Sequence, residues 1–322
     1  MTRFAWLQFR MQAAVAVGAL AVIAVVLAVT GPNLVHLYNT SVANCAARGN
    51  CAAATTAFLS NDHVLQDLGN LLIALPALAG MFWGAPLMAR ELETRTEQLV
   101  WTQSITRSRW ILAKLGLIGL ASAAASGLLS LMLTWWSNPF DRVNMNKFTS
   151  VFDQRDVVPI GYAAFAFALG VTAGALIRRT LPAMASTLVA FVAVRLVFTH
   201  LVRPHLITPV RVVTALNATS GMTFNETNNG PLTLIGAKPG AWVNSAQVVN
   251  KAGHLVSGVF LDHGACLQSR AARACIGQLR EALVYQPASR YWAFQWYETA
   301  IFLALAFVLG GFCVWWVRSR LA

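Results

Sequence analysis

The residues with the clearest chemical potential lie in one short charged segment between two apolar stretches. Arg90 to Trp110 reads RELETRTEQLVWTQSITRSRW and contains all three glutamates of the first 200 residues. Glu93 and Glu97 are four residues apart and share one side of a helix, whereas Leu92 and Leu99 fall on another. Such a face offers charge-based binding rather than catalysis. We expect a contact surface for a cytoplasmic protein; the alternative is a solvated amphipathic turn lying on the membrane.

Motifs for catalysis or nucleotide binding do not occur in the sequence. It has no GxxxxGK[ST] phosphate loop, no HExxH zinc motif and no GxSxG nucleophile motif. We therefore predict that the chain is not an enzyme, has no catalytic residues and binds no metal or cofactor itself. Any work driven by ATP would need a partner that supplies the nucleotide site.

The composition is that of an integral membrane protein. Hydrophobic residues make up 57% of the 322 residues and charged residues 11%, whereas soluble domains have about 25% charged residues. The net charge of +12 would suggest nucleic acid in a soluble chain. Here Arg and Lys cluster beside apolar stretches, where they anchor to lipid headgroups and set orientation. We therefore expect membrane lipids, and no nucleic acid, as partners.

Six stretches have the roughly 20 apolar residues that a helix needs to cross a bilayer. They are Gln12–Val35, Leu68–Ala89, Ile111–Trp136, Pro159–Ile177, Leu181–Leu201 and Trp292–Val317. Arg178 and Arg179, in the tight turn after the fourth span, mark the cytoplasmic side, and basic residues at both ends of the chain agree with it. We predict an all-α membrane protein with six transmembrane helices and both termini in the cytoplasm.

The segment between spans 5 and 6 is long enough to form a domain. Residues 203–290 combine strand-like alternation and turn signals with a helical-looking end, Ala265–Val284, and a bare loop of this length is uncommon. We predict a small extracytoplasmic domain there. Residues 1–202 would then hold helices 1–5 with the connector 90–110, and residues 291–322 would hold helix 6 and a cytoplasmic tail.

Four cysteines lie in the outer segments as two close pairs, Cys45 with Cys51 and Cys266 with Cys275. On the oxidising side of a membrane, such pairs predict two small disulfide loops. Four free thiols are one alternative, and a bridge between the two loops is another.

Two ionisable residues lie within the predicted spans at matching depths. Arg195 lies six residues before the outer end of span 5, and Glu298 lies six residues after the start of span 6, which is about 9 Å in each case. A lone charge at such a depth is costly, so these groups usually pair or face a watered cavity. We predict an Arg195–Glu298 salt bridge; the alternative is an Arg195 that meets an anionic group of a ligand.

The connector resembles the one that joins spans 2 and 3 in the permeases of type-2 ATP-binding-cassette (ABC) exporters. The residues that match are Arg90-Glu91, Thr96, Leu99, Thr102, Thr106-Arg107-Ser108-Arg109 and Lys114. In that family a stretch of the form RE…GT…L…TxPxSR…K forms the coupling helix against the ATPase subunit. Arg95 stands where the family usually has Gly, and Ser104 where it often has Pro, so the connector departs from the family in detail.

The resemblance implies a transport subunit that works in a larger complex. A second copy or a paralogue would complete the pathway, and two cytoplasmic ABC ATPase subunits, with ATP and Mg, would dock on the connectors. The implied coupling residues are Arg90, Glu91, Glu93, Glu97, Arg107 and Arg109. Spans 2 and 5 of two subunits line the central cavity in that family, which makes Phe82, Trp83, Phe191, Arg195 and Phe198 the cavity candidates. Their character favours an amphipathic or hydrophobic exported molecule, and the location implied is the plasma membrane of a bacterium.

A second class of function is a membrane sensor or immunity subunit that does not transport. Its ligand would bind to the outer domain, residues 203–290, which is unusually large for a connecting loop.

The six-span topology predicts which positions are reachable from each side. Single cysteines introduced at Ser104 and Thr180 should react with an impermeant thiol reagent only from the cytoplasm. Cysteines introduced next to Asn50 and Asn228 should react only from outside, and the unmodified protein measures the background from its own cysteines. Reversed accessibility at any one of the four positions would contradict this topology.

Overall fold

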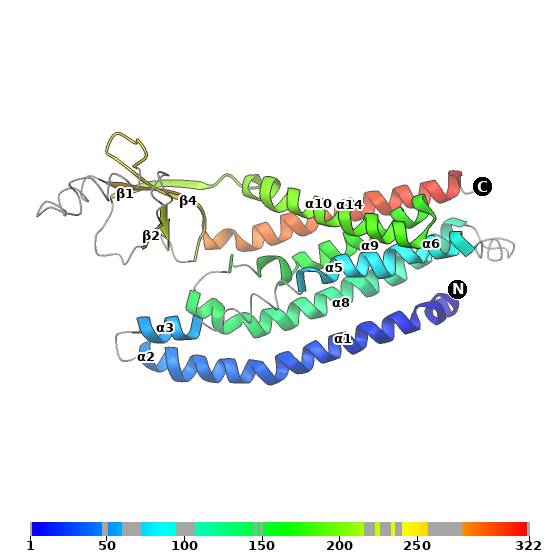
Figure 1. Ribbon diagram of the computed structural model, residues 1–322, viewed down its shortest axis with the longest axis horizontal. Helices are drawn as coiled ribbons and strands as arrows, with labels where there is room; N and C mark the ends of the chain where they lie inside the picture. Colours follow the sequence, from blue (N-terminus) through cyan, green and yellow to red (C-terminus); the bar gives the residue numbers. More distant parts are fainter. Residues whose placement is uncertain are drawn as a thin grey trace, which may run out of the picture. The chain divides into compact units, whose positions relative to one another are not determined.

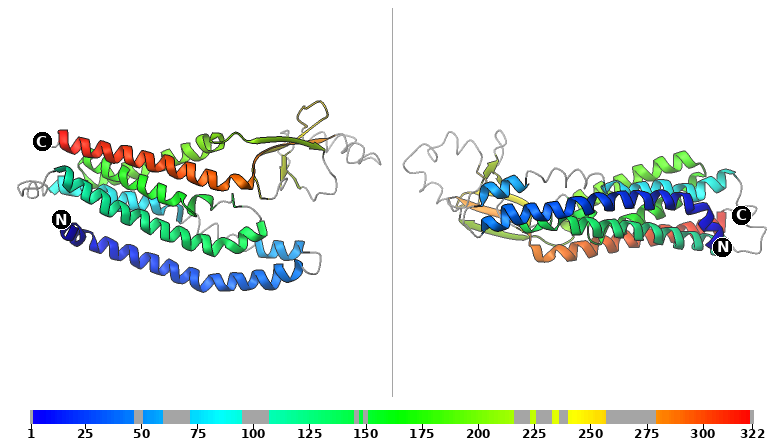
Figure 2. Two further views of the ribbon diagram at one scale, coloured as in Figure 1. Left: turned by 180° about the vertical axis from the view of Figure 1, so that it is seen from behind. Right: turned by 90° about the horizontal axis from the view of Figure 1, so that it is seen from below.

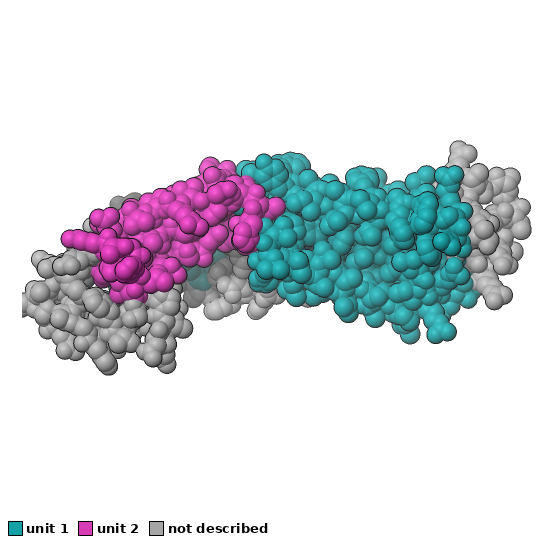
Figure 3. All heavy atoms as spheres, turned by 90° about the horizontal axis from the view of Figure 1, so that it is seen from above, with its two compact units in different colours: residues 1–143, 149–203, 292–322 teal, residues 144–148, 204–291 magenta. Residues whose placement is uncertain are grey.

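The computed structural model describes most of the chain, and what it describes divides into two compact units (Figure 3). The described residues are 2–46, 51–59, 72–94, 107–144, 147–148, 151–215, 223–225, 233–235, 240–256 and 279–320. Unit 1 comprises residues 1–143, 149–203 and 292–322, and unit 2 comprises residues 144–148 and 204–291.

Unit 1 is built from long helices that run side by side (Figures 1 and 2). They are α1 (Thr2–Leu37), α8 (Arg107–Asn144), α9 (Val158–Ile177), α10 (Thr180–Val197) and α14 (Tyr291–Arg320). Shorter elements extend or connect them: η1 (Tyr38–Ala43), α2 (Asn44–Ala46), α3 (Ala52–Leu59), η3 (Phe152–Gln154), η4 (Phe198–Val202) and η5 (Arg203–His205). Within the described residues, five helical stretches are long and apolar enough to cross a membrane. The prediction of a mostly helical, multi-pass membrane protein is thereby confirmed.

The predicted second span, Leu68–Ala89, is not confirmed. Its described part forms a run of α5 (Leu75–Ala79), the wider π-helical turn η2 (Gly80–Gly84) and α6 (Ala85–Thr94). This run is not one of the five apolar stretches found among the described residues, and residues 68–71 of the predicted span lie outside them. Helix α6 continues without a break into the charged sequence RELET. The helix therefore reaches well into the segment predicted to be the connector.

Helix α9 is the most enclosed of the five candidate spans. Its apolar stretch is 67% buried, whereas the other four candidate spans are 17–28% buried. The sequence VPIGYAAFAFALGVTAGALI is apolar around the whole circumference, as expected for a helix surrounded by protein. Pro159 lies in its first turn, where a missing N–H is tolerated. Arg178 ends the helix in the left-handed conformation, and α10 begins at Thr180.

Helix α9 contacts the α5–η2–α6 run backbone to backbone. A Cβ atom at Gly170 would lie 2.2 Å from the carbonyl oxygen of Gly80. A Cβ atom at Gly174 would lie 2.4 Å from the carbonyl oxygen of Ala85. Real Cβ atoms do not approach backbone atoms this closely, so only glycine fits at these positions.

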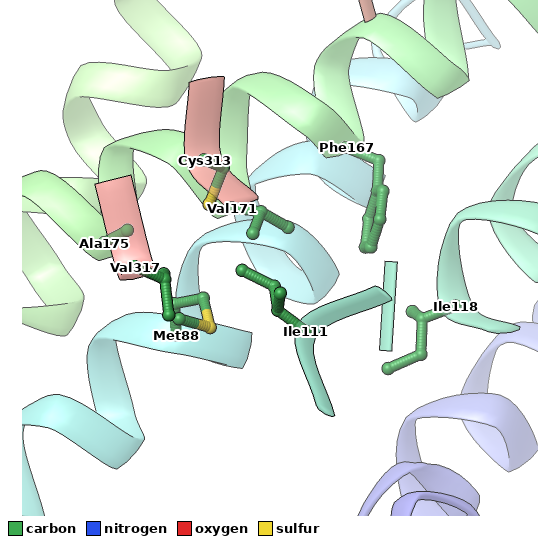
Figure 4. Packing of buried hydrophobic residues seen from close by; sticks show 8 residues of the cluster. All are labelled: Met88, Ile111, Ile118, Phe167, Val171, Ala175, Cys313 and Val317. Carbon is green, nitrogen blue, oxygen red and sulfur yellow. The ribbon is translucent and has the colours of Figure 1, made fainter. Parts of the chain in front are cut away.

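Apolar side chains from four helices fill the space between them near the two flanks of the connector. Figure 4 shows this cluster, which consists of Met88, Ile111, Ile118, Phe167, Val171, Ala175, Cys313 and Val317. Met88 of α6 precedes the connector and Ile111 of α8 follows it, and neither side chain is exposed. The residues on both sides of the connector are therefore fixed to the same core.

Unit 2 contains a five-stranded antiparallel sheet among its described residues, so the all-α prediction is wrong for this part of the chain. The strands are β1 (Val210–Ala215), β2 (Thr223–Asn225), β3 (Thr233–Ile235), β4 (Trp242–Val249) and β5 (Arg280–Gln286), in the order β1-β5-β4-β3-β2. Strand β5 covers the end of the predicted helical segment Ala265–Val284, where pairing on both sides overrides the local helical pattern. Glu281, Leu283 and Tyr285 alternate on its buried face.

Cys45 and Cys51 are joined by a disulfide, which closes a short loop between α2 and α3. The other predicted pair, Cys266 and Cys275, lies outside the described residues.

The contact of α9 with the α5–η2–α6 run predicts that Gly170→Ala destabilises the protein. The added methyl group meets backbone atoms that cannot move aside, and overpacking of this kind costs on the order of 1–3 kcal/mol. The unfolding temperature of the purified protein in detergent should fall. Gly116→Ala, on the open side of α8, is the matched control and should leave it unchanged or raised. Equal unfolding temperatures for the two variants would contradict the close packing.

Candidate functional site

Four charged side chains of unit 1 form one buried cluster where α10 ends and α14 begins. Arg195 donates to Oδ2 of Asp153 at 2.6 Å, and Arg203 pairs with the other carboxylate oxygen of Asp153. Arg203 also donates two hydrogen bonds to Glu298, from Nε to Oε2 at 2.9 Å and from Nη2 to Oε1 at 2.7 Å. The two positive and two negative charges cancel, which is the condition for keeping ionised groups away from water.

The predicted direct salt bridge between Arg195 and Glu298 is therefore wrong. Both residues belong to one charge cluster, but Asp153 and Arg203 stand between them. The guanidinium group of Arg203 binds the Glu298 carboxylate in a bidentate manner, which suits the planar geometry of both groups. Sequence reasoning missed Asp153 and Arg203 because both lie just outside the apolar stretches, where a charge needs no explanation. Arg195 and Glu298 balance each other within the predicted spans, so their charges gave no signal that Asp153 and Arg203 were their partners.

Tyr162 and Phe152 complete the surroundings of the cluster. The hydroxyl of Tyr162 contacts Glu298 and accepts from Nη2 of Arg203 at 3.2 Å. The guanidinium carbon of Arg195 lies 4.8 Å from the centre of the Tyr162 ring, and that of Arg203 lies 4.9 Å from the Phe152 ring. These cation–π contacts add to the ion pairs. The guanidinium groups are thus committed to protein partners, which supports a structural role over a contact with an anionic ligand.

Gln295 of α14 forms hydrogen bonds with backbone groups at the start of α9, near this cluster. Its Oε1 accepts from the backbone N–H groups of Val157 and Val158 at 3.3 and 3.1 Å, and its Nε2 donates to the carbonyl of Phe152 at 3.1 Å. The N–H groups of a first helical turn have no partner within the helix. A single buried amide from another helix satisfies two of them and holds α14 against α9.

An apolar cavity of about 480 Å³ lies between α1, the α5–η2 segment and α8. Phe82 and Trp83, two of the predicted cavity residues, line it. Val15 and Ile23 of α1 form the facing wall, and Ser122 of α8 lies along the third side. Its volume is within the range of small-molecule sites.

The other predicted cavity residues lie elsewhere. Phe191 and Phe198 are buried in a cluster of aromatic rings, where the Phe198 and Phe302 centroids are 5.0 Å apart and those of Phe191 and Phe165 are 6.1 Å apart. Arg195 belongs to the charge cluster. The aromatic side of α10 therefore packs against α9 and α14, and the cavity is formed without it.

The flanks of the connector are held to neighbouring helices by carboxylates of α6. Glu91 pairs with Lys114 of α8, which is almost fully buried. Glu93 accepts from the backbone N–H of Thr180 at 3.1 Å and from its hydroxyl at 2.7 Å, so it caps the first turn of α10. These hydrogen bonds, helped by nearby Arg179, lower the pKa of Glu93. Two of the predicted coupling residues thus link α6 to α8 and α10.

The remaining predicted coupling residues are less fully described. Arg90 is exposed on α6. Arg107 and Arg109 lie in the first turn of α8, but their side chains are outside the described set, as is Glu97 altogether. Within the described part of the chain, no group of three or more His, Cys, Asp or Glu residues is placed to hold a metal ion.

Comparison with known proteins identifies a family for the helical part of the chain. A family model described as "ABC-2 membrane transporter related" matches residues 17–203, more than half of the chain. This confirms the resemblance that was based on the connector. The matched region begins in α1 and ends at Arg203. No curated protein and no solved structure matches.

The charge cluster predicts the consequences of neutralising Glu298. Glu298→Gln leaves a net positive charge in a buried site, and loss of one partner of a buried ion pair costs about 3–5 kcal/mol. The unfolding temperature in detergent should fall sharply, and adding Arg203→Gln should recover part of the loss because neutrality returns. Recovery by Arg195→Gln without recovery by Arg203→Gln would instead support a direct pair of Arg195 with Glu298.

Proposed function

Because the chain belongs to the family of ABC-2-related membrane transporters, we propose that it is the membrane subunit of an ATP-driven ABC exporter. The observation that supports this most strongly is the family match across the helices that flank the connector. ATP and Mg would be bound by a separate cytoplasmic ATPase, and this chain would form the pathway.

The proposal places the connector end of unit 1 in the cytoplasm. The start of α1, the end of α14 and the end of α6 lie at the same end of the unit (Figure 1). Exposed arginines gather there, namely Arg90, Arg178, Arg179, Arg318 and Arg320. Positive residues favour the cytoplasmic side of a membrane. This supports both termini inside and, with the α5–η2–α6 run as the remaining span, six transmembrane segments with residues 203–290 outside.

The contacts of α6 supply a route from the connector to the helices. Glu91 joins α6 to α8 through Lys114, and Glu93 joins it to α10 through Thr180. The glycine contacts join α6 to α9. A push on the connector by an ATPase that closes on ATP would therefore move these helices together and switch access to the pathway.

The complete exporter would contain two copies of this chain, or this chain and a paralogue, with two ATPase subunits. Its cargo would be amphipathic or hydrophobic, because the cavity lined by Phe82 and Trp83 is apolar. The location would be the plasma membrane of a bacterium. A sensor or immunity subunit is not favoured, since the family match covers the helices and not the outer segment.

Coupling is tested by reversing the charges of the connector. A tagged chain purified from its native host should bring down an ABC ATPase and its vanadate-sensitive ATP hydrolysis. Glu93→Lys with Glu97→Lys should reduce the co-purified activity at least roughly tenfold, because charge reversal against a complementary surface weakens binding strongly.

The control weakens the cap that Glu93 forms on α10 without changing the charge of the connector. Thr180→Ala removes the 2.7 Å hydrogen bond to Glu93 but keeps the charge of the connector, so it should retain the ATPase. Full co-purification with the double charge reversal would leave the connector as a solvated turn and remove the support for coupling.

A further inference from the structure

We propose that the C-terminal end of α14 binds one anionic phospholipid. The lipid phosphate would lie on the guanidinium group of Arg318, and the upper part of an acyl chain would lie along the helix beside Gly311. The site is formed by α14 of this chain alone, so the inference goes beyond the transport function and does not depend on an ATPase.

A hollow of about 620 Å³ opens on one side of the last turns of α14. Its lining residues lie three or four positions apart and therefore share that side of the helix, namely Gly311, Val314, Trp315, Arg318 and Ser319. Cys313 and Val317 lie on the opposite side and pack into the apolar cluster of Figure 4. The hollow therefore faces away from the packed core of unit 1.

The apolar part of the hollow suits hydrocarbon. Gly311 has no side chain, and a Cβ atom there would meet nothing within 4 Å, so packing within the chain does not require this glycine. The Trp315 indole beside it is 54% exposed. One turn earlier, the same side of the helix continues with Phe307 and Val308, which are 79% and 68% exposed. An acyl chain laid along this strip removes apolar surface from an otherwise open face.

Arg318 is the charged residue of the lining, and it lies at one end of the hollow. It is exposed, and among the described residues no carboxylate pairs with it, whereas the buried cations of unit 1 are paired. The Ser319 hydroxyl already donates to the carbonyl of Trp315 at 2.9 Å. An anion in the hollow would therefore be bound by the guanidinium group, which can donate two parallel hydrogen bonds to phosphate oxygens.

The distance between the charged and the apolar parts selects a phospholipid over a free phosphate. Arg318 follows Gly311 by seven residues, which is about 10 Å along the helix. A phospholipid carries its phosphate and its first acyl carbons on one molecule at such a separation, whereas a free phosphate would leave the apolar strip uncovered. A net negative headgroup is favoured over a zwitterionic one because the choline cation of the latter opposes the guanidinium charge.

A second copy of this chain is a less suitable occupant of the same face. A two-fold axis through the hollow would bring two Arg318 side chains together, and such like charges at an interface are unfavourable.

The surroundings add a general attraction that the test has to separate from a defined site. The hollow lies at the end of unit 1 where α6 leads into the connector, and Arg90, Arg178 and Arg179 are also exposed at that end (Figure 1). A basic surface of this kind attracts anionic lipids without fixing one of them in place. A defined site differs because its occupancy saturates and depends on one arginine.

Photo-crosslinking of the purified full chain in phosphatidylcholine nanodiscs tests the site. Two lipid probes carry the same diazirine near the glycerol, one with a phosphatidylglycerol and one with a phosphatidylcholine headgroup. Peptic peptides are analysed by mass spectrometry. The anionic probe should label the end of α14 about fivefold more than the zwitterionic probe, which is the effect of one arginine near a membrane surface. This labelling should saturate as the anionic fraction rises, whereas labelling at the Arg178–Arg179 turn should rise in proportion.

Two matched pairs of variants assign the effect to one charge and to the hollow. Arg318→Gln should lower anionic labelling of α14 to the zwitterionic level, and Arg320→Gln, which removes an exposed charge from the other side of the helix, should keep the preference. Gly311→Leu fills the hollow and should reduce labelling by both probes. Gly310→Leu adds the same side chain outside the lining and should retain the labelling.

Several results would overturn the proposal. They are equal labelling of α14 by the two probes, labelling that does not saturate, and an anionic preference that survives Arg318→Gln or is lost equally with Arg320→Gln. Absence of labelling at α14 with either probe would show that another protein chain covers this face, and it would overturn the proposal as well.

Discussion

The arrangement of unit 1 depends on one backbone contact, the one between α9 and the α5–η2–α6 run. Glycines on both sides bring the chains so close that Gly170 leaves no room for a Cβ beside Gly80. In a membrane, water does not drive helices together, so this kind of close packing is a main source of association. It fixes α6 along α9, and α6 in turn determines where the connector begins. A substitution on the side of α6 that faces α9 would therefore displace both α6 and the start of the connector.

The charges of unit 1 are arranged at the two ends of this packed core. At one end Arg195, Asp153, Arg203 and Glu298 neutralise one another between α10, η3, η5 and α14. At the other end the carboxylates of α6 reach α8 and α10. Each end thus connects helices that the glycine contact alone does not hold. A rearrangement that opens one end has to break the ion pairs at that end. These ion pairs therefore stabilise the packed arrangement of the helices against a second, open arrangement.

Hydropathy predicted where five of the helices lie, because long apolar stretches have few alternatives in a membrane. It did not predict the partners of the buried charges. Arg195 and Glu298 were matched by their depth along the helices. Depth does not determine the direction in which a side chain points around the helix axis, and in the structure Glu298 pairs with Arg203. The connector was predictable as a motif because its residue types are specific. The capping of α10 by Glu93 was not, since it depends on a turn distant in sequence.

The aromatic cavity candidates of spans 2 and 5 do not lie together within this chain, for a related reason. An aromatic stripe such as Phe191 and Phe198 has the same pattern whether it faces a ligand or a neighbouring helix. Here Phe198 of η4 packs against Phe302 and Phe191 of α10 packs against Phe165, so the cavity is formed without them and has α1 as one of its walls.

Helix α1 contacts α8 through described side chains near the end that leads into η1, and it also forms one wall of the cavity. Near the end of α1 that leads into η1, the Trp136 indole of α8 donates to the hydroxyl of Thr30 at 2.9 Å, and Leu27 is buried beside Leu133. Toward its start the helix is exposed, with Val15 at 71%. The wall that α1 contributes to the cavity therefore takes no part in the glycine contact between α9 and the α5–η2–α6 run.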